Sequence, residues 1–142
     1  MARVLFLLAA TIASASLSTP AAGAEHEHAE HFTRCAKACS ACQLECDACF
    51  SHCLGLVADG KKEHAKTARL CADCGECCKL AATLCARQGP LAGPACECCA
   101  KCCDECAAAC EKYPDQKHMV ECAKSCRECA KACREMLKHV GK

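Results

Sequence analysis

Cysteine recurs at a helical spacing in the stretch from Cys35 to Cys53. The cysteines there follow one another at steps of 4, 3, 4, 3 and 4 residues. An average step of about 3.5 residues is typical of side chains along one face of a helix that packs against other helices. At about 1.5 Å of rise per residue, six thiols would line about 27 Å of that face. Thiols are soft metal ligands and redox-active groups, so this face indicates metal or sulfur chemistry beyond ordinary packing.

The same spacing recurs in three further segments, which predicts four helices. We expect them at residues 28–58, 61–87, 94–113 and 116–140. Helix-breaking residues separate them, namely Gly60, the segment Gln88–Pro94 and Pro114. Pro94 is predicted to open the third helix and Asp115 to cap the fourth. Helices of this length with short connections predict an all-α fold, an up-down-up-down antiparallel four-helix bundle.

Nineteen of the 22 cysteines fall on rows that would face the bundle axis, which predicts a cysteine-lined core. These are Cys35, Cys39, Cys42, Cys46, Cys49, Cys53, Cys71, Cys74, Cys78, Cys85, Cys96, Cys99, Cys103, Cys106, Cys110, Cys122, Cys126, Cys129 and Cys133. The other three lie just beside the rows, and they are Cys77, Cys98 and Cys102. Large aliphatic residues are scarce after residue 24, so cysteine, which behaves as a small hydrophobe, must help to form the core.

The first 24 residues have the features of a secretory signal peptide. Arg3 precedes an apolar run, Val4–Ala13, and small residues end at Ala24, which predicts cleavage before Glu25. Residues 25–142 would then be one domain in an exported protein, periplasmic or secreted, with no membrane attachment. Without the signal peptide the chain carries no net formal charge, and this does not favour a nucleic-acid partner.

Three chemistries compete for rows of thiols. A disulfide scaffold is common in cysteine-dense exported chains, but neighbours on one helix face lack the geometry of a disulfide. Zinc and iron–sulfur sites want isolated sets of four ligands, usually on turns or loops. Cu(I) is soft and accepts two or three thiolates, so thiols at i and i+4, such as Cys35 and Cys39, could share one ion. The spacing favours many Cu(I) ions per chain, and a disulfide-rich domain or a zinc-binding protein remains the alternative.

The chain also resembles the cysteine-lined four-helix-bundle copper storage proteins. The resemblance extends over residues 25–142 and is most specific at His52-Cys53, at the segment Cys110–Pro114 and in the row from Cys122 to Cys133. It implies a copper store, with about one Cu(I) per cysteine inside the bundle and tetramers among exported members. It also implies copper uptake at one end of the bundle, where His and Met supplement the thiols.

Three residues beyond the cysteines are candidate copper ligands at that end. The resemblance places a copper-binding histidine at His52. His118 lies one i,i+4 step before Cys122, and the Met119 thioether suits Cu(I). We expect these three to set the rate of exchange with a copper donor or acceptor, while the thiols set capacity. His64 lies at the same end and is interpreted as a solvated helix-end residue. No nucleophile–base pair or carboxylate pair indicates an enzyme.

Overall fold

The computed structural model describes residues 22–140, and within that range the chain is helical. Four α-helices follow one another as α1 (Ala22–Ala58), α2 (Ala65–Ala86), α3 (Ala92–Cys110) and α4 (Lys117–Leu137), with a short 3-10 helix, η1 (Lys62–His64), before α2. The described residues form no strand, and none of their helices is long and apolar enough to cross a membrane. The predicted all-α fold is confirmed.

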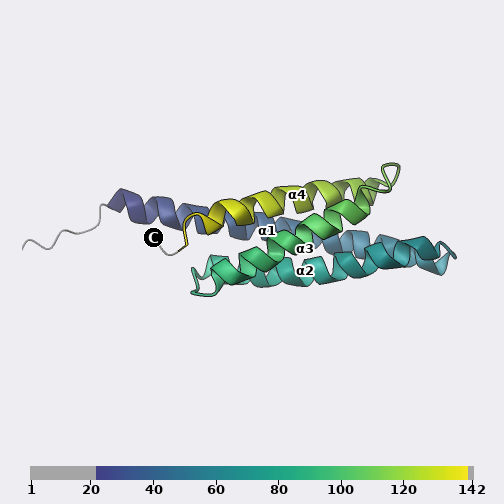
Figure 1. Cartoon of the computed structure of the whole chain (residues 1–142), viewed down its shortest axis with the longest axis horizontal. Helices are drawn as coiled ribbons and strands as arrows, with labels where there is room; N and C mark the ends of the chain where they lie inside the picture. The colour runs from purple at the N-terminus through teal and green to yellow at the C-terminus, as the bar shows by residue number, and fades with distance from the viewer. Residues whose placement is uncertain (1–21, 141–142) are drawn as a thin grey trace, which may run out of the picture.

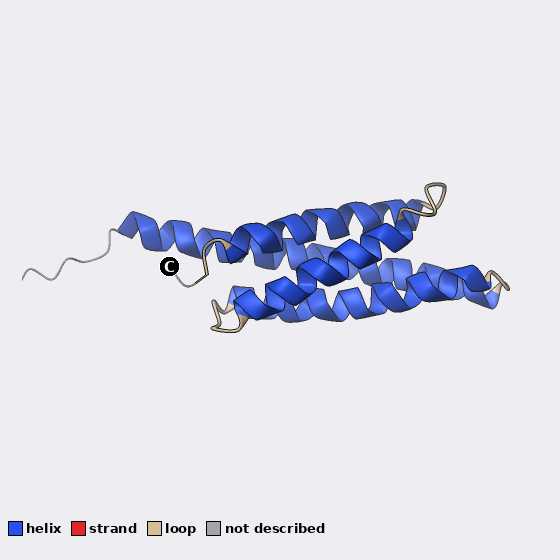
Figure 2. Ribbon diagram, viewed as in Figure 1, coloured by secondary structure: helices blue, strands red, loops and turns tan. Residues whose placement is uncertain are grey.

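The helices form a ring of antiparallel neighbours. α1 packs against α2 and α4, and α3 packs against the same two helices (Figure 1). α1 and α3 therefore face each other across the bundle axis, as do α2 and α4. The connections between consecutive helices alternate between the two ends of the bundle (Figure 2). This is the predicted up-down-up-down topology.

The N-terminal helix starts earlier than expected. α1 begins at Ala22 instead of residue 28, so the predicted cleavage point before Glu25 falls inside the helix. Residues 1–21 of the predicted signal peptide lie outside the described residues. An apolar run that ends in small residues does not by itself distinguish a signal peptide from the approach to an alanine-rich helix, since alanine is the strongest helix former.

Two of the helix ends follow from backbone conformations with positive φ. Gly60 has a φ of 88° and terminates α1, and the Lys61 N–H donates a 2.9 Å hydrogen bond back to the Leu56 carbonyl. Gln88 has a φ of 49° after α2, and the Gly89 N–H donates to the Leu84 carbonyl at 2.9 Å. Both ends have the left-handed cap that satisfies the last carbonyls of a helix.

The starts of α3 and α4 differ from the predictions. α3 begins at Ala92, so Pro94 lies within the first turn instead of opening the helix; the N–H that proline lacks has no helical partner there in any case. Asp115 does not cap α4, because the N-cap is Gln116, which has extended backbone angles and makes no side-chain capping bond. Tyr113 and Pro114 fall in the turn before α4 and not in α3.

The core contains few large side chains, which lets the helices approach closely. Among the residues whose burial is described, most buried ones are cysteine and alanine, and the larger apolar side chains are Phe32, Met119 and Met136. At Gly75 a Cβ atom would lie 3.2 Å from Asp47 Oδ1, so α2 meets α1 where a side chain would crowd the contact. On the surface, Arg127 of α4 donates hydrogen bonds of 2.9 and 2.8 Å to Glu111, just beyond α3.

Candidate metal centre

The buried thiols of all four helices meet along the bundle axis. Every buried cysteine except Cys53 belongs to one network of Sγ–Sγ contacts of 3.3 to 4.0 Å, which we call the sulfur column. It comprises Cys35, Cys39, Cys42, Cys46, Cys49, Cys71, Cys74, Cys78, Cys85, Cys96, Cys99, Cys103, Cys106, Cys110, Cys122, Cys126, Cys129 and Cys133. The prediction that the cysteine rows face one axis is confirmed, and Cys53 continues the α1 row, fully buried.

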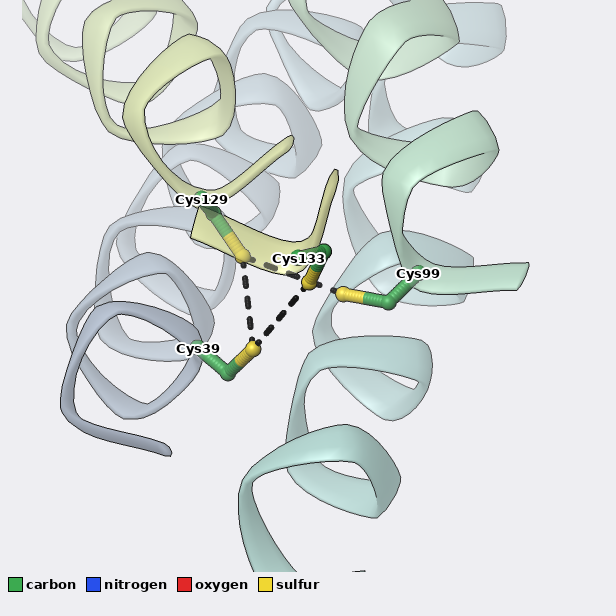
Figure 3. A group of neighbouring side chains, drawn as sticks. All are labelled: Cys39, Cys99, Cys129 and Cys133. Atoms are coloured by element: carbon green, nitrogen blue, oxygen red, sulfur yellow. Dashed lines mark hydrogen bonds between the residues drawn. The ribbon is translucent and has the colours of Figure 1, made fainter. Parts of the chain in front are cut away.

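Within the sulfur column the thiols gather in compact sets of four, each drawn from two or more helices. One set joins Cys39 of α1, Cys99 of α3 and the α4 pair Cys129 and Cys133, with all four Sγ atoms within 4.8 Å of one another. Figure 3 shows these side chains pointing toward a common centre. Further sets of the same kind follow along the axis to Cys49, Cys71, Cys110 and Cys122.

Several neighbouring sets share members, and contacts such as Cys99–Cys78 at 3.6 Å link the others, which makes the sulfur column continuous. Cys42 belongs to one set with Cys74, Cys78 and Cys103 and to another with Cys46, Cys74 and Cys126. No gap therefore isolates four ligands from the next four. A metal ion bound in one set would share thiolates with ions in the sets on either side.

The shortest Sγ–Sγ contacts in the sulfur column run between helices. The i,i+4 pairs Cys35–Cys39 and Cys42–Cys46 have Sγ atoms 4.0 and 3.9 Å apart. Across helices, Cys85 and Cys96 are separated by 3.3 Å, and contacts even span the axis, as between Cys35 of α1 and Cys96 of α3 at 3.6 Å. The sequence predicted the pairs along each helix but could not reveal these cross-helix partners.

All 22 cysteines are free thiols in the structure. Sγ–Sγ separations of 3.3 to 4.0 Å in the sulfur column exceed the roughly 2.05 Å of a disulfide bond. Burial disfavours the thiolate and raises the pKa of Cys53 to about 12. A metal ion that binds such a protonated thiol must displace its proton, so loading releases protons.

One end of the bundle brings His52, His118 and Met119 close to the last thiols of the sulfur column. The rings of His52 and His118 lie 4.9 Å apart, and His52 Nε2 is 3.1 Å from Gln116 Oε1. With the Nε2–H donating to Gln116, the His52 Nδ1 lone pair is free to bind a metal. His118 is exposed, whereas Met119 is fully buried and lies three residues before Cys122.

A shallow groove of about 480 Å³ lies beside the two histidines. His52 and His118 line it, together with Gly55, Leu56 and Asp59 of the α1 C-terminus. The groove gives solvent and larger molecules access to the imidazoles. Gln116, which orients His52, carried no signal in the sequence because its partner lies on a different helix.

His64 corrects the expectation of a solvated histidine at this end. Its side chain is only 5% exposed and its ring lies 4.4 Å from that of Tyr113. His64 Nδ1 is buried and has no hydrogen-bond partner among the described residues. A buried polar atom without a partner costs free energy, so this nitrogen is a candidate to bind a ligand.

The opposite end of the sulfur column is covered by larger side chains. Phe32 and Met136 are buried there, near the Cys35 and Cys133 end of the α1 and α4 rows. The rings of His31 and His139 stack at 3.5 Å with an angle of 15° between their planes, and Arg34 donates a 2.6 Å hydrogen bond to His31 Nδ1. At this end the Nδ1 atom of the histidine, His31, is hydrogen-bonded to Arg34. At the other end, His52 and His118 line an open groove.

Cys77, Cys98 and Cys102 lie outside the sulfur column. We call them the outer trio. They lie between α2 and α3, and Cys98 is exposed, whereas Cys77 and Cys102 are half-buried. The spacing of the sequence pairs Cys98 with Cys102, one i,i+4 step apart on the same helix, but it gave no sign that Cys77 of the neighbouring helix meets them.

A four-helix bundle whose axis is a continuous series of buried thiols is a protein suited to binding many soft metal ions. Comparison with known protein families identifies the family to which the chain belongs. Residues 9–138 match the family model described as Csp, copper storage protein. The chain belongs to the copper storage protein family, and the predicted family is confirmed.

Solved structures of copper storage proteins resemble the chain over most of its length. A cytosolic copper storage protein from Streptomyces lividans, in a copper-loading structure with five coppers, is 29% identical over 80% of this chain and 97% of its own, with a TM-score of 0.72. A structure of the Streptomyces lividans protein loaded with 10 copper equivalents is 28% identical over 87% of this chain and 93% of its own, with a TM-score of 0.70. A Cu(I)-bound copper storage protein of Bacillus subtilis is 33% identical over 72% of this chain and 94% of its own, with a TM-score of 0.67. Comparison with curated proteins finds no match.

The comparison overturns one prediction. The expectation of an exported, periplasmic or secreted protein is wrong, because the similar Streptomyces lividans protein is described as cytosolic. The physical reason lies in the thiols, which number 22 and are all free in the structure. Free thiols persist in reducing compartments, whereas oxidising compartments favour disulfides.

Proposed function

We propose that this protein stores Cu(I) as a chain of ions held by the thiolates of the sulfur column. One observation carries the proposal: buried Sγ atoms from all four helices form a continuous network that ends near the His52 side of the bundle. Cys53 extends this network at the same end. Cu(I) binds thiolate strongly and tolerates thiolates shared between ions, so such a network can fill along its length.

The balance of charge favours Cu(I) over a divalent ion in this core. One Cu(I) per thiolate replaces one proton with one positive charge, so the filled core stays neutral. A Zn²⁺ ion held by four thiolates leaves two negative charges at each site, and uncompensated charge is costly in a buried, apolar interior. Zinc would also need separate sets of four thiols, whereas the sets here share members such as Cys42 and Cys126.

The same arrangement supports storage over catalysis. The thiols of the sulfur column are fully or almost fully buried, and each set of four is closed by ligands from the protein. A catalytic metal needs an open coordination position that a substrate can reach. We infer that the protein is a store and not an enzyme.

Copper passes through the His52 end in this proposal. His52, His118 and Met119 bind Cu(I) without adding negative charge, so they hold it less tightly than thiolate and can pass it inward. The buried, unpartnered Nδ1 of His64 offers a further nitrogen at this end. The groove beside His52 and His118 suits the approach of a copper donor or acceptor protein.

We also propose a homo-oligomer, a tetramer as the family resemblance implies. The support is the exposure of four leucines, which are Leu44 at 68%, Leu54 at 48%, Leu80 at 55% and Leu91 at 62%. In an oligomer, contact with another subunit would remove these side chains from water. Light scattering coupled to size-exclusion chromatography measures the assembly.

An anaerobic titration with Cu(I) against a chromogenic chelator tests the storage function. We expect a plateau of about one ion per cysteine and a graded filling, because the thiolates are shared between ions. The same titration with Zn²⁺ serves as the control and is expected to stop at about one ion per four thiols. A Cu(I) plateau of only a few ions, or a larger capacity for Zn²⁺, would contradict the proposal.

A further inference from the structure

The outer trio is a compact cluster of thiols on the surface of the bundle. Cys77 Sγ of α2 lies 3.1 Å from Cys102 Sγ and 3.9 Å from Cys98 Sγ, both on α3. None of the three is among the residues of the sulfur column, and Cys98 is exposed to solvent. A small molecule in solution can therefore reach this cluster, at Cys98, without entering the core.

Cysteine doublets in the sequence explain why the cluster exists. In Cys77-Cys78, Cys98-Cys99 and Cys102-Cys103 the second cysteine is buried in the sulfur column and the first is not. Consecutive residues point about 100° apart on a helix, so each doublet places one thiol on the axis and one toward the neighbouring helix. α1 and α4 contain no doublet. The outer trio is thus confined to α2 and α3, which are neighbours in the bundle.

Core packing does not account for the outer trio. Other half-buried positions of the bundle hold residues that do not oxidise readily, such as Ala72 and Ala132, and an exposed free cysteine is a liability because it does. Three such thiols on adjacent helices are spaced for a shared ligand. With metal–sulfur bonds of about 2.3 Å, three sulfurs in a plane around one ion lie about 4.0 Å apart. The 3.9 Å between the Cys77 and Cys98 Sγ atoms fits this value, and the 3.1 Å between Cys77 and Cys102 is shorter, so Cys102 Sγ would move away from Cys77 when the three thiolates share an ion.

We propose that Cys77, Cys98 and Cys102 bind one Cu(I) in a separate, three-thiolate site that exchanges with solution faster than the sulfur column does. An incoming thiol or chelator can attack an ion at this site directly, because Cys98 is exposed. Ions in the sulfur column have no exposed thiolate and must leave through an end. The proposal rests on the proposed function only in taking Cu(I) as the metal.

The test compares two triple variants of the full-length, reduced protein, each lacking three thiols. The first is Cys77→Ser, Cys98→Ser and Cys102→Ser. The second removes three members of one buried set, as Cys49→Ser, Cys71→Ser and Cys110→Ser. Each is loaded anaerobically with the Cu(I)–acetonitrile complex and then mixed with excess bathocuproine disulfonate, and copper release is followed by absorbance. We expect a fast phase of about one ion per chain in the wild type and in the buried-set variant, and its loss in the outer-trio variant, with capacity down by about one ion.

A labelling experiment on the wild type makes the test independent of how the variants fold. Apo and Cu(I)-saturated protein are treated briefly with a thiol-specific alkylating reagent, and the modified peptides are identified by mass spectrometry. We expect rapid labelling of the outer trio in the apo protein and protection after loading. Unchanged labelling at saturation, or a Cys77–Cys102 disulfide in place of bound copper, would overturn the proposal. If storage in the sulfur column were wrong instead, total capacity would be small in the wild type and the fast phase would dominate it.

Discussion

Replacing Cys42 and Cys46 with serine tests whether the sulfur column is a ladder of linked sites or one cooperative cluster. Cys42 Sγ contacts Cys126 at 3.6 Å and Cys103 at 4.0 Å, and Cys46 Sγ contacts Cys126 at 3.7 Å. The double variant removes two ligands from the central set and one from the set on each side. Serine hydroxyls do not replace thiolates for a soft ion.

The sets at either end of the sulfur column keep all their ligands in this variant. They are Cys39, Cys99, Cys129 and Cys133 at one end and Cys49, Cys71, Cys110 and Cys122 at the other. With about one ion per thiolate, we expect a loss of about two Cu(I) ions per chain while the rest remain bound. In the apo protein, each buried hydroxyl without a good partner costs about 1–3 kcal/mol of folding free energy.

The assay is an anaerobic Cu(I) titration, with circular dichroism to confirm that the variant remains helical. A matched control, Ser40→Ala with Ala48→Ser, exchanges one hydroxyl between two exposed positions of the same helix and should keep full capacity. An all-or-none loss of copper in a folded Cys42→Ser, Cys46→Ser variant would refute the ladder. Unchanged capacity would show that these thiols do not bind copper at all.

Two further predictions concern exchange and stability. Replacing His52, His118 and Met119 with alanine should slow copper uptake from a donor severalfold and leave total capacity almost unchanged; wild-type rates in a stopped-flow transfer assay would place uptake elsewhere. Apo protein should lose stability as pH rises above about 8.5, because burial raises the pKa of Cys53 to about 12, above its unfolded value. The folded state then holds protons that the unfolded state releases, so stability is complete below that pH and declines above it. Cu(I) should raise the Tm and remove this pH dependence, because it binds only the folded state and displaces the protons; an apo Tm that stays constant from pH 7 to 10 would contradict the argument.

The sequence by itself determined the helices and the face that each one buries. Steps of three and four residues between cysteines, as in the row from Cys35 to Cys53, fix which side chains share a helix face, because the α-helix has 3.6 residues per turn. Glycine and proline near Gly60 and Pro114 fixed the breaks within a few residues. The copper storage family could be recognised from the same features, since its cysteine rows are local in sequence.

Only the tertiary structure decided which thiols meet. The contact between Cys85 and Cys96, the sharing of sulfurs between successive sets and the meeting of Cys77 with Cys102 depend on how neighbouring helices are aligned along the axis. The burial of His64 against Tyr113 is of the same kind. Helix periodicity specifies a direction around each helix but not the axial offset between helices, and packing of side chains from different helices sets that offset.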